Sequence, residues 1–86
     1  MIGIGIDVAL KEQENGPFSD QAVASQVIKD LCRECGIWGD LTDVQKEALD
    51  MIAHKIARIL AGNQDNKDHW GDIAGYASLV LRELYQ

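Results

Sequence analysis

Residues 41–62, LTDVQKEALDMIAHKIARILAG, and residues 68–77, DHWGDIAGYA, decide the fold of this chain. In both stretches apolar residues recur every three or four positions, which is the period of an amphipathic α-helix. The gap between the two stretches is short and polar. Helices joined by such a loop usually pack as antiparallel neighbours, so we predict a helical hairpin at the C-terminal end.

Local signals set the ends of this hairpin. Thr42 followed by Gln45 is a capping-box pattern, and Gly62 is a typical residue to end a helix, so the first helix is predicted over 42–61. The second helix is predicted over 67–85. The residues expected on their buried sides are Val44, Ala48, Leu49, Ile52, Ala53, Ile56 and Leu60 in the first, and Trp70, Ile73, Ala74, Ala77, Val80, Leu81 and Leu84 in the second.

Upstream of the hairpin, a third helix is predicted over 18–36. Ser19 is a suitable N-cap, Phe18 would then pack on Val23, and Gly36 would end the helix. Its apolar stripe comprises Val23, Ala24, Val27, Ile28, Leu31 and Cys35. Residues 1–17 are expected to form a short extended or irregular arm and a turn. The prediction is therefore a single all-α domain over residues 1–86, with three main helices.

Composition limits the partners of the chain. It has 86 residues, eight Lys and Arg against 14 Asp and Glu, and a net charge of −6, so a nucleic acid polymer is an unexpected partner. No apolar run is long enough to span a membrane, and no signal peptide is recognisable, so we expect a cytoplasmic protein. A chain this short buries only about 60–65% of its unfolded surface, which favours a homo-oligomer. The two cysteines, Cys32 and Cys35, are interpreted as buried thiols.

Lys55 is an exception on the first hairpin helix, because it falls inside the apolar arc. A lysine there must extend past the edge of the core or meet an anion. In an antiparallel hairpin Lys55 and Arg58 come near Asp68, Asp72 and Tyr76. Two interpretations remain open: interhelical salt bridges that hold the hairpin together, or a pocket in which cations meet phosphate and carboxylates meet a ribose or a metal.

Other residues near this constellation are less informative. Gly71 and Gly75, four positions apart, would leave a smooth notch that admits a flat ligand or another backbone. His54 lies on the polar side of its helix and is either solvated or a ligand contact. His69 is expected at the surface.

The sequence also resembles a family of small phage and prophage proteins of unknown function. Members carry an H-K-x-x-R helix and then a D-x-W-x-D-I-A-G-Y-A helix, preceded by a G-x-F-S-D segment and a helix with a lysine. The matching residues here are Gly16, Phe18, Ser19, Asp20, Gln26, Lys29, His54, Lys55, Arg58, Asp68, Trp70, Asp72, Gly75 and Tyr76. The resemblance spans residues 10–86 and implies that these residues form one site or one packing unit, in a protein of an infected or lysogenic bacterium.

More distantly, the hairpin is similar to the all-α nucleotide pyrophosphohydrolases related to MazG. Those enzymes hold magnesium around a triphosphate with an E-x-x-E pair on one helix and E-x-x-D on another. Here Glu47 and Asp50 match one acidic pair, Asp68 and Asp72 are four apart, and the first glutamate cluster has no counterpart. The comparison therefore favours binding over turnover, with no cofactor unless Mg²⁺ serves a divergent hydrolase.

The leading hypothesis is a phage-type protein that binds a phosphorylated small molecule, a nucleotide or nucleotide-derived signal, as a sponge or regulator. The alternatives are a protein-interaction module that docks on a host protein and a divergent Mg-dependent NTP pyrophosphohydrolase. No catalytic or metal-binding residues are assigned. The predicted ligand-binding residues are Lys29, His54, Lys55, Arg58, Asp68, Trp70, Asp72 and Tyr76.

Overall fold

We analysed a computed structural model that describes residues 10, 13, 16–62 and 64–86. Its regular elements are all helical: α2 (Phe18–Glu34), the 3₁₀ turn η1 (Trp38–Asp40), α3 (Asp43–Ala61) and α4 (Lys67–Leu84). The all-α prediction is confirmed, because the described part of the chain contains no strand. Most of the predicted arm over 1–17 lies outside the described residues. None of the described helices is long and apolar enough to cross a membrane.

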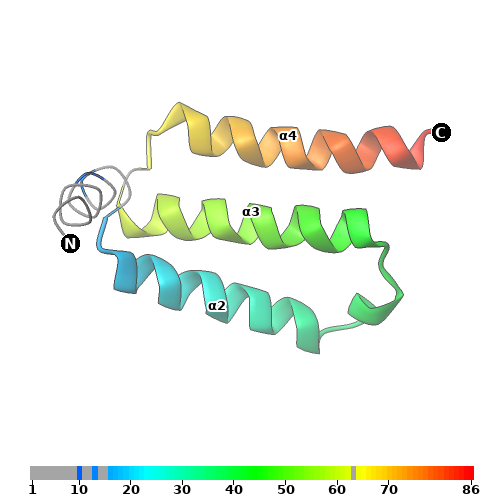
Figure 1. The fold of residues 1–86 in the computed structure, drawn as a ribbon, viewed down its shortest axis with the longest axis horizontal. Helices are drawn as coiled ribbons and strands as arrows, with labels where there is room; N and C mark the ends of the chain where they lie inside the picture. The colour runs from blue at the N-terminus through cyan, green and yellow to red at the C-terminus, as the bar shows by residue number, and fades with distance from the viewer. Residues whose placement is uncertain (1–9, 11–12, 14–15, 63) are drawn as a thin grey trace, which may run out of the picture.

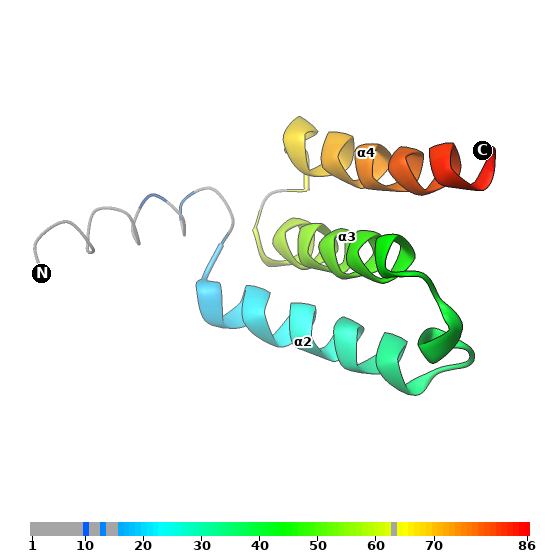
Figure 2. The same cartoon turned by 45° about the vertical axis from the view of Figure 1, so that its right-hand side comes forward.

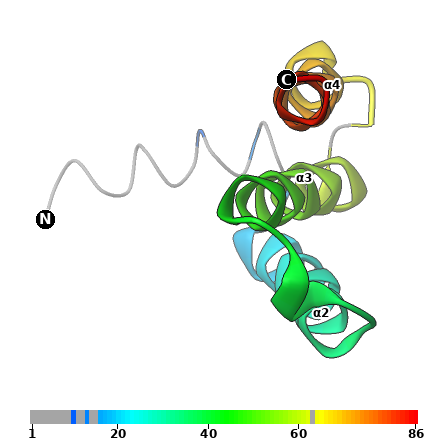
Figure 3. The same ribbon diagram turned by 90° about the vertical axis from the view of Figure 1, so that its right-hand side faces the viewer.

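The three α-helices form one layer in which α3 is the middle member (Figure 1). The chain runs up and down, so α3 is antiparallel to both of its neighbours, and α2 and α4 lie on opposite sides of it (Figures 2 and 3). Among the three described α-helices, each outer helix therefore has one α-helical neighbour, and α3 is packed on two sides.

The interior of this layer is small. Among the described residues the buried apolar side chains are those of three alanines, Ala48, Ala53 and Ala57, and all of them belong to α3. No large side chain in the described part of the chain is fully buried. Because each buried methyl or methylene group contributes only about 0.8 kcal/mol, these alanines supply little of the stability that a domain needs.

The ends of α3 agree with the sequence signals. The Thr42 hydroxyl accepts a hydrogen bond from the backbone N–H of Gln45 (3.1 Å), and the Gln45 side chain accepts one from the N–H of Thr42 (2.9 Å). The capping box is therefore complete, and Gly62 is the C-cap at the other end. The predicted helix over 42–61 is confirmed.

The start of α2 differs from the prediction. Phe18 is already helical, and the N-cap is Pro17, whose carbonyl accepts hydrogen bonds from the N–H groups of Asp20 and Gln21. Proline keeps the backbone extended at the N-cap (φ −58°, ψ 131°), so the helix begins immediately after it. Ser19 as the N-cap was wrong, and Phe18 is the first residue of the helix rather than the residue before its cap.

The packed side of α2 also differs from the predicted stripe. Val23, Val27 and Leu31 are each more than 60% exposed, whereas Gln21 and Ser25 are buried. The reason is that, among the described α-helices, α2 packs against α3 and presents its Gln21–Ser25 line to it. The apolar arc of this helix is broad, and the contact with α3 covers only one edge.

The second hairpin helix, α4, begins where predicted but is rotated. Asn66, which sequence analysis did not single out, caps it by accepting hydrogen bonds from the N–H groups of Asp68 and His69. The predicted buried side is wrong in part, because Trp70, Leu81 and Leu84 are more than half exposed. The line that faces α3 comprises His69, Ile73, Tyr76 and Val80, which are buried or half-buried.

A layer one helix thick has two broad faces, and here they differ in chemistry. Successive helical residues are rotated by about 100°, so the positions of α2 and α4 around α3 assign each residue to a face. The polar face carries Lys29 and Arg33 of α2, Glu47, His54 and Arg58 of α3, and Asp72, Tyr76 and Leu79 of α4. The apolar face carries Ala24, Ile28 and Leu31 of α2, Gln45, Leu49, Ile56 and Leu60 of α3, and Trp70, Ala74, Ala77, Leu81 and Leu84 of α4.

Candidate functional site

Lys55 is directed toward α4, as the sequence predicted. Its Nζ lies 3.0 Å from Oδ2 of Asp72, and only 12% of the Lys55 side chain is exposed. Asp72 is about half exposed, so one side of its carboxylate remains open to solvent. This ion pair ties the middle of α3 to the first half of α4 and places Asp72 at the border of the polar face.

A second ion pair fixes the level of α2 against α3. Nη2 of Arg33 lies 3.6 Å from Oδ1 of Asp50. Because the two helices are antiparallel, four residues back along α2 correspond to four residues forward along α3. Lys29 is therefore level with His54. One turn further, Ser25 of α2 is level with Arg58 of α3.

His54 lies among positive charges. Burial is the largest cause that lowers the pKa of His54 below its ordinary value of 6.5. The charges of Arg58 and Lys29 lower it further, followed by those of Lys55 and His69. Among the residues that the structure describes, no carboxylate opposes these effects at His54. The imidazole therefore reports a local positive potential in a protein whose net charge is −6.

Two polar atoms on the same level are buried without hydrogen-bond partners among the described residues. They are Nε of Arg58 and Oγ of Ser25. A buried donor without a partner costs about 1–3 kcal/mol, so such atoms call for an explanation. The predicted pairing of Arg58 with Asp68 or Asp72 is not found within the described residues, and Asp72 is occupied by Lys55.

His69 is buried, with 5% of its surface exposed, and its predicted surface position was wrong. The Asn66 cap places His69 one turn into α4 on the side that faces α3. Burial is the largest cause that lowers the pKa of His69, and Lys55 and Arg58 lower it further. The carboxylates of Asp72 and Asp68 act in the opposite direction. Asp68 itself is exposed in the first turn of α4.

The predicted notch on α4 exists as a shallow groove of about 310 Å³, lined by Gly71, Asp72, Gly75, Tyr76 and Leu79. Neither glycine has a neighbouring atom within 4 Å of where a Cβ would stand, so the floor of the groove is open. A second hollow of about 300 Å³ shares Tyr76 and Leu79 and continues toward Val44 and Glu47 of α3. Asp72 and Tyr76 thus line one side of the polar face.

Trp70 does not join this group. Its side chain is 55% exposed on the apolar face, and its Nε1–H donates a hydrogen bond to the backbone oxygen of Gln64 (2.7 Å). Trp70 and Asp72 are two residues apart on one helix, which turns their side chains in nearly opposite directions. Of the two aromatic residues predicted to bind the ligand, Tyr76 is the one that lies beside Asp72.

Metal ligation has no visible basis in the described residues, where no three His, Cys, Asp or Glu side chains are grouped as a metal site would require. The acidic residues that resemble those of pyrophosphohydrolases are partly occupied, because Asp50 pairs with Arg33 and Asp72 with Lys55.

The predicted burial of both thiols was wrong: Cys32 is half-buried, and Cys35 is exposed at the C-cap of α2.

We compared the chain with known proteins. No family model matches it, and neither the curated proteins nor the solved structures gave a match.

Proposed function

We propose that this protein binds a small phosphorylated molecule, a nucleotide or a nucleotide-derived signal, on its polar face, and acts as a sponge or regulator. The observation that carries the proposal is the positive charge around His54. Arg58 and Lys29 are level with this imidazole or one turn away, and neither has a carboxylate within ion-pair distance among the described residues. Such a group of cations is stabilised by an anion.

Arg58 is the residue best placed to hold phosphate. A guanidinium offers several N–H donors in a fixed plane that matches phosphate oxygens, and its charge does not depend on pH. Nε of Arg58 is buried without a partner in the described residues, so a bound oxygen would satisfy it. Lys29 would supply a second charge from α2. His54 would donate a hydrogen bond and take up a proton when an anion arrives.

The rest of the ligand would lie toward α4. Asp72 keeps an exposed oxygen beyond its contact with Lys55, and a carboxylate accepts hydrogen bonds from sugar hydroxyls. Beyond it, the groove over Gly71 and Gly75 is flat and bordered by Tyr76, which suits a planar base. Lys55 would act by holding Asp72 in place.

Calorimetry with a panel of nucleoside mono-, di- and triphosphates tests this function. We expect wild type to bind at least one of them and Arg58→Gln to weaken that binding about tenfold or more, the effect of roughly one lost charged contact. Arg82→Gln is the matched control, because Arg82 is an exposed arginine in the last turn of α4. The proposal fails if folded wild type binds no member of the panel, or if both variants weaken binding equally.

The two alternatives give different results in the same samples. If these residues only hold the helices of an interaction module together, Arg58→Gln lowers thermal stability and no nucleotide raises the melting temperature of wild type. If the protein is a divergent pyrophosphohydrolase, wild type with Mg²⁺ releases pyrophosphate from a nucleoside triphosphate and Asp72→Asn does not. Binding without release supports the sponge or regulator.

A further inference from the structure

The apolar face of the layer is the largest feature that the proposed ligand site leaves unexplained. Its exposed side chains include Leu49 (40% exposed), Leu60 (70%), Trp70 (55%), Leu81 (51%) and Leu84 (65%). The stripes that form this face are mostly apolar, with Asp20 and Lys67 in the first turns of α2 and α4 as charged members, although charged residues make up 26% of the chain. A face of this size and chemistry on a small protein marks an interaction surface.

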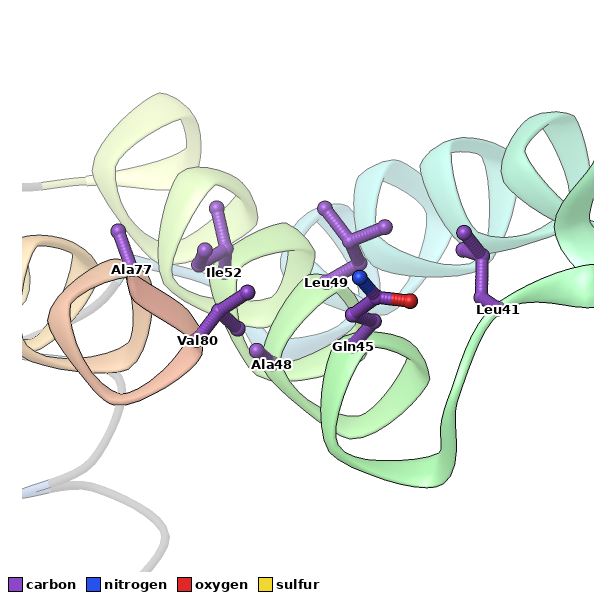
Figure 4. Close-up of a pocket in the computed structure, with 7 residues that line it drawn as sticks. All are labelled: Leu41, Gln45, Ala48, Leu49, Ile52, Ala77 and Val80. Carbon is purple, nitrogen blue, oxygen red and sulfur yellow. The ribbon is translucent and has the colours of Figure 1, made fainter. Parts of the chain in front are cut away.

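This face has a hollow between α3 and α4 (Figure 4). The hollow measures about 300 Å³ and lies between the first half of α3 and the second half of α4. Its lining is Leu41, Leu49, Ile52, Ala77 and Val80, with Gln45 as the polar member beside Ala48. The same face therefore offers an apolar hollow at one end and protruding side chains elsewhere, such as Leu60 and Trp70, that can fill one.

The size of the face matches what a stable dimer needs. The 19 residues of α3 span about 28 Å, and three helices packed about 9 Å apart cover roughly 27 Å, so the layer presents a footprint of roughly 750 Å². Standard interfaces bury about 800 Å² on each partner. A standard interface would therefore use the whole apolar face. A partner that covers the whole face must be as broad as the layer itself.

The fold also restricts which partner this is. The described part of one chain buries only three alanines as apolar residues, so the stability of the chain depends on covering this face. The partner that covers the apolar face must therefore be available whenever this chain is made. A second copy meets this condition without any other molecule, and it brings an apolar face of the same size.

We propose that two copies of this chain pair through their apolar faces to form a two-layer helical dimer. Trp70, Leu81 and Leu84 become buried between the layers. The polar faces, with His54 and Arg58, point outward on both sides, so the charged groups of these faces stay away from the contact. Pairing does not depend on the ligand site proposed above.

Sedimentation equilibrium at 1–100 µM tests the pairing. Wild type is expected at twice the 9.5 kDa chain mass, and Leu81→Glu at the monomer mass. Leu79→Glu is the matched control, because Leu79 is a 43% exposed leucine of the same helix that lines the groove on the polar face. This variant should remain dimeric. Circular dichroism reports whether each variant retains its helices.

A second measurement does not require Leu81→Glu to fold, because it uses wild type. The melting temperature of a dimer that unfolds to free chains rises with protein concentration, whereas that of a monomer does not. The variant Trp38→Phe leaves Trp70 as the source of tryptophan fluorescence. Acrylamide should quench this fluorescence weakly, because the dimer buries Trp70 between the layers. A monomeric wild type, equal effects of Leu79→Glu and Leu81→Glu, or a different protein bound stoichiometrically in place of a second copy would each overturn the proposal.

Discussion

The middle helix and the two outer helices of this layer use similar sequences in different ways. All three have broad apolar arcs, yet among the described residues α3 alone supplies buried apolar side chains, while α2 buries Gln21 and Ser25 and α4 buries His69. The difference follows from the number of described α-helical neighbours, because α3 has two and each outer helix has one. An amphipathic sequence therefore defines which residues can be buried, and the packing decides which of them are.

The substitution with the largest expected effect on the free energy of unfolding tests whether α3 is the packed centre of the layer. Ala57 has no exposed surface, so Ala57→Leu must push α2 away or distort α3. Overpacking of this kind costs about 1–3 kcal/mol, and we expect the upper end because Ala57 has no solvent on any side. Ser78→Leu introduces the same side chain at an exposed position of α4 and should change the free energy of unfolding by less than about 0.5 kcal/mol. Urea unfolding measures both, and equal losses would contradict the comparison.

A smaller effect compares how α3 and α2 begin. Thr42→Ala removes the hydroxyl that accepts from the N–H of Gln45 and should cost about 1 kcal/mol. Ser19→Ala should be nearly neutral, because α2 starts after Pro17 and Ser19 is already inside the helix. The free energy of unfolding of the two variants is the measurement. A loss at Ser19 as large as that at Thr42 would restore Ser19 as a cap.

The sequence predicted what is decided locally. The ends of α3 follow from Thr42, Gln45 and Gly62, which act within one turn of the backbone. The inward position of Lys55 follows from its place in the apolar arc and from the short loop that brings Asp72 opposite. These signals need no knowledge of how the helices rotate.

The sequence did not predict the rotation of the outer helices. The arc of α4 is wide enough to accommodate two orientations, and the contact with α3 selected the line of His69 and Ile73 over that of Trp70. This choice moved Trp70 out of the candidate site and His69 into the interior. The unpartnered Nε of Arg58 depends on the same packing, so no pattern in the sequence could reveal it.

The smallest expected effect concerns the protonation of His54 on the polar side of α3. Burial and the nearby cations lower the pKa of His54 in the folded chain, whereas the unfolded chain titrates near 6.5. Below that value the unfolded chain binds more protons than the folded one, so the free energy of unfolding falls as pH decreases through 6.5. Melting temperatures measured at fixed protein concentration from pH 7.5 to 5.5 should therefore decline in wild type.

His54→Gln separates this contribution from the other titrating groups. Glutamine does not titrate, so the decline below pH 6.5 should be shallower in this variant, while His69, whose pKa is also lowered, keeps part of it. Inorganic phosphate sharpens the test, because an anion beside Arg58 and Lys29 favours the protonated imidazole and should reduce the decline in wild type. An identical decline in wild type and His54→Gln would mean that His54 is solvated, and that the positive potential on the polar face of α3 is weaker than the geometry indicates.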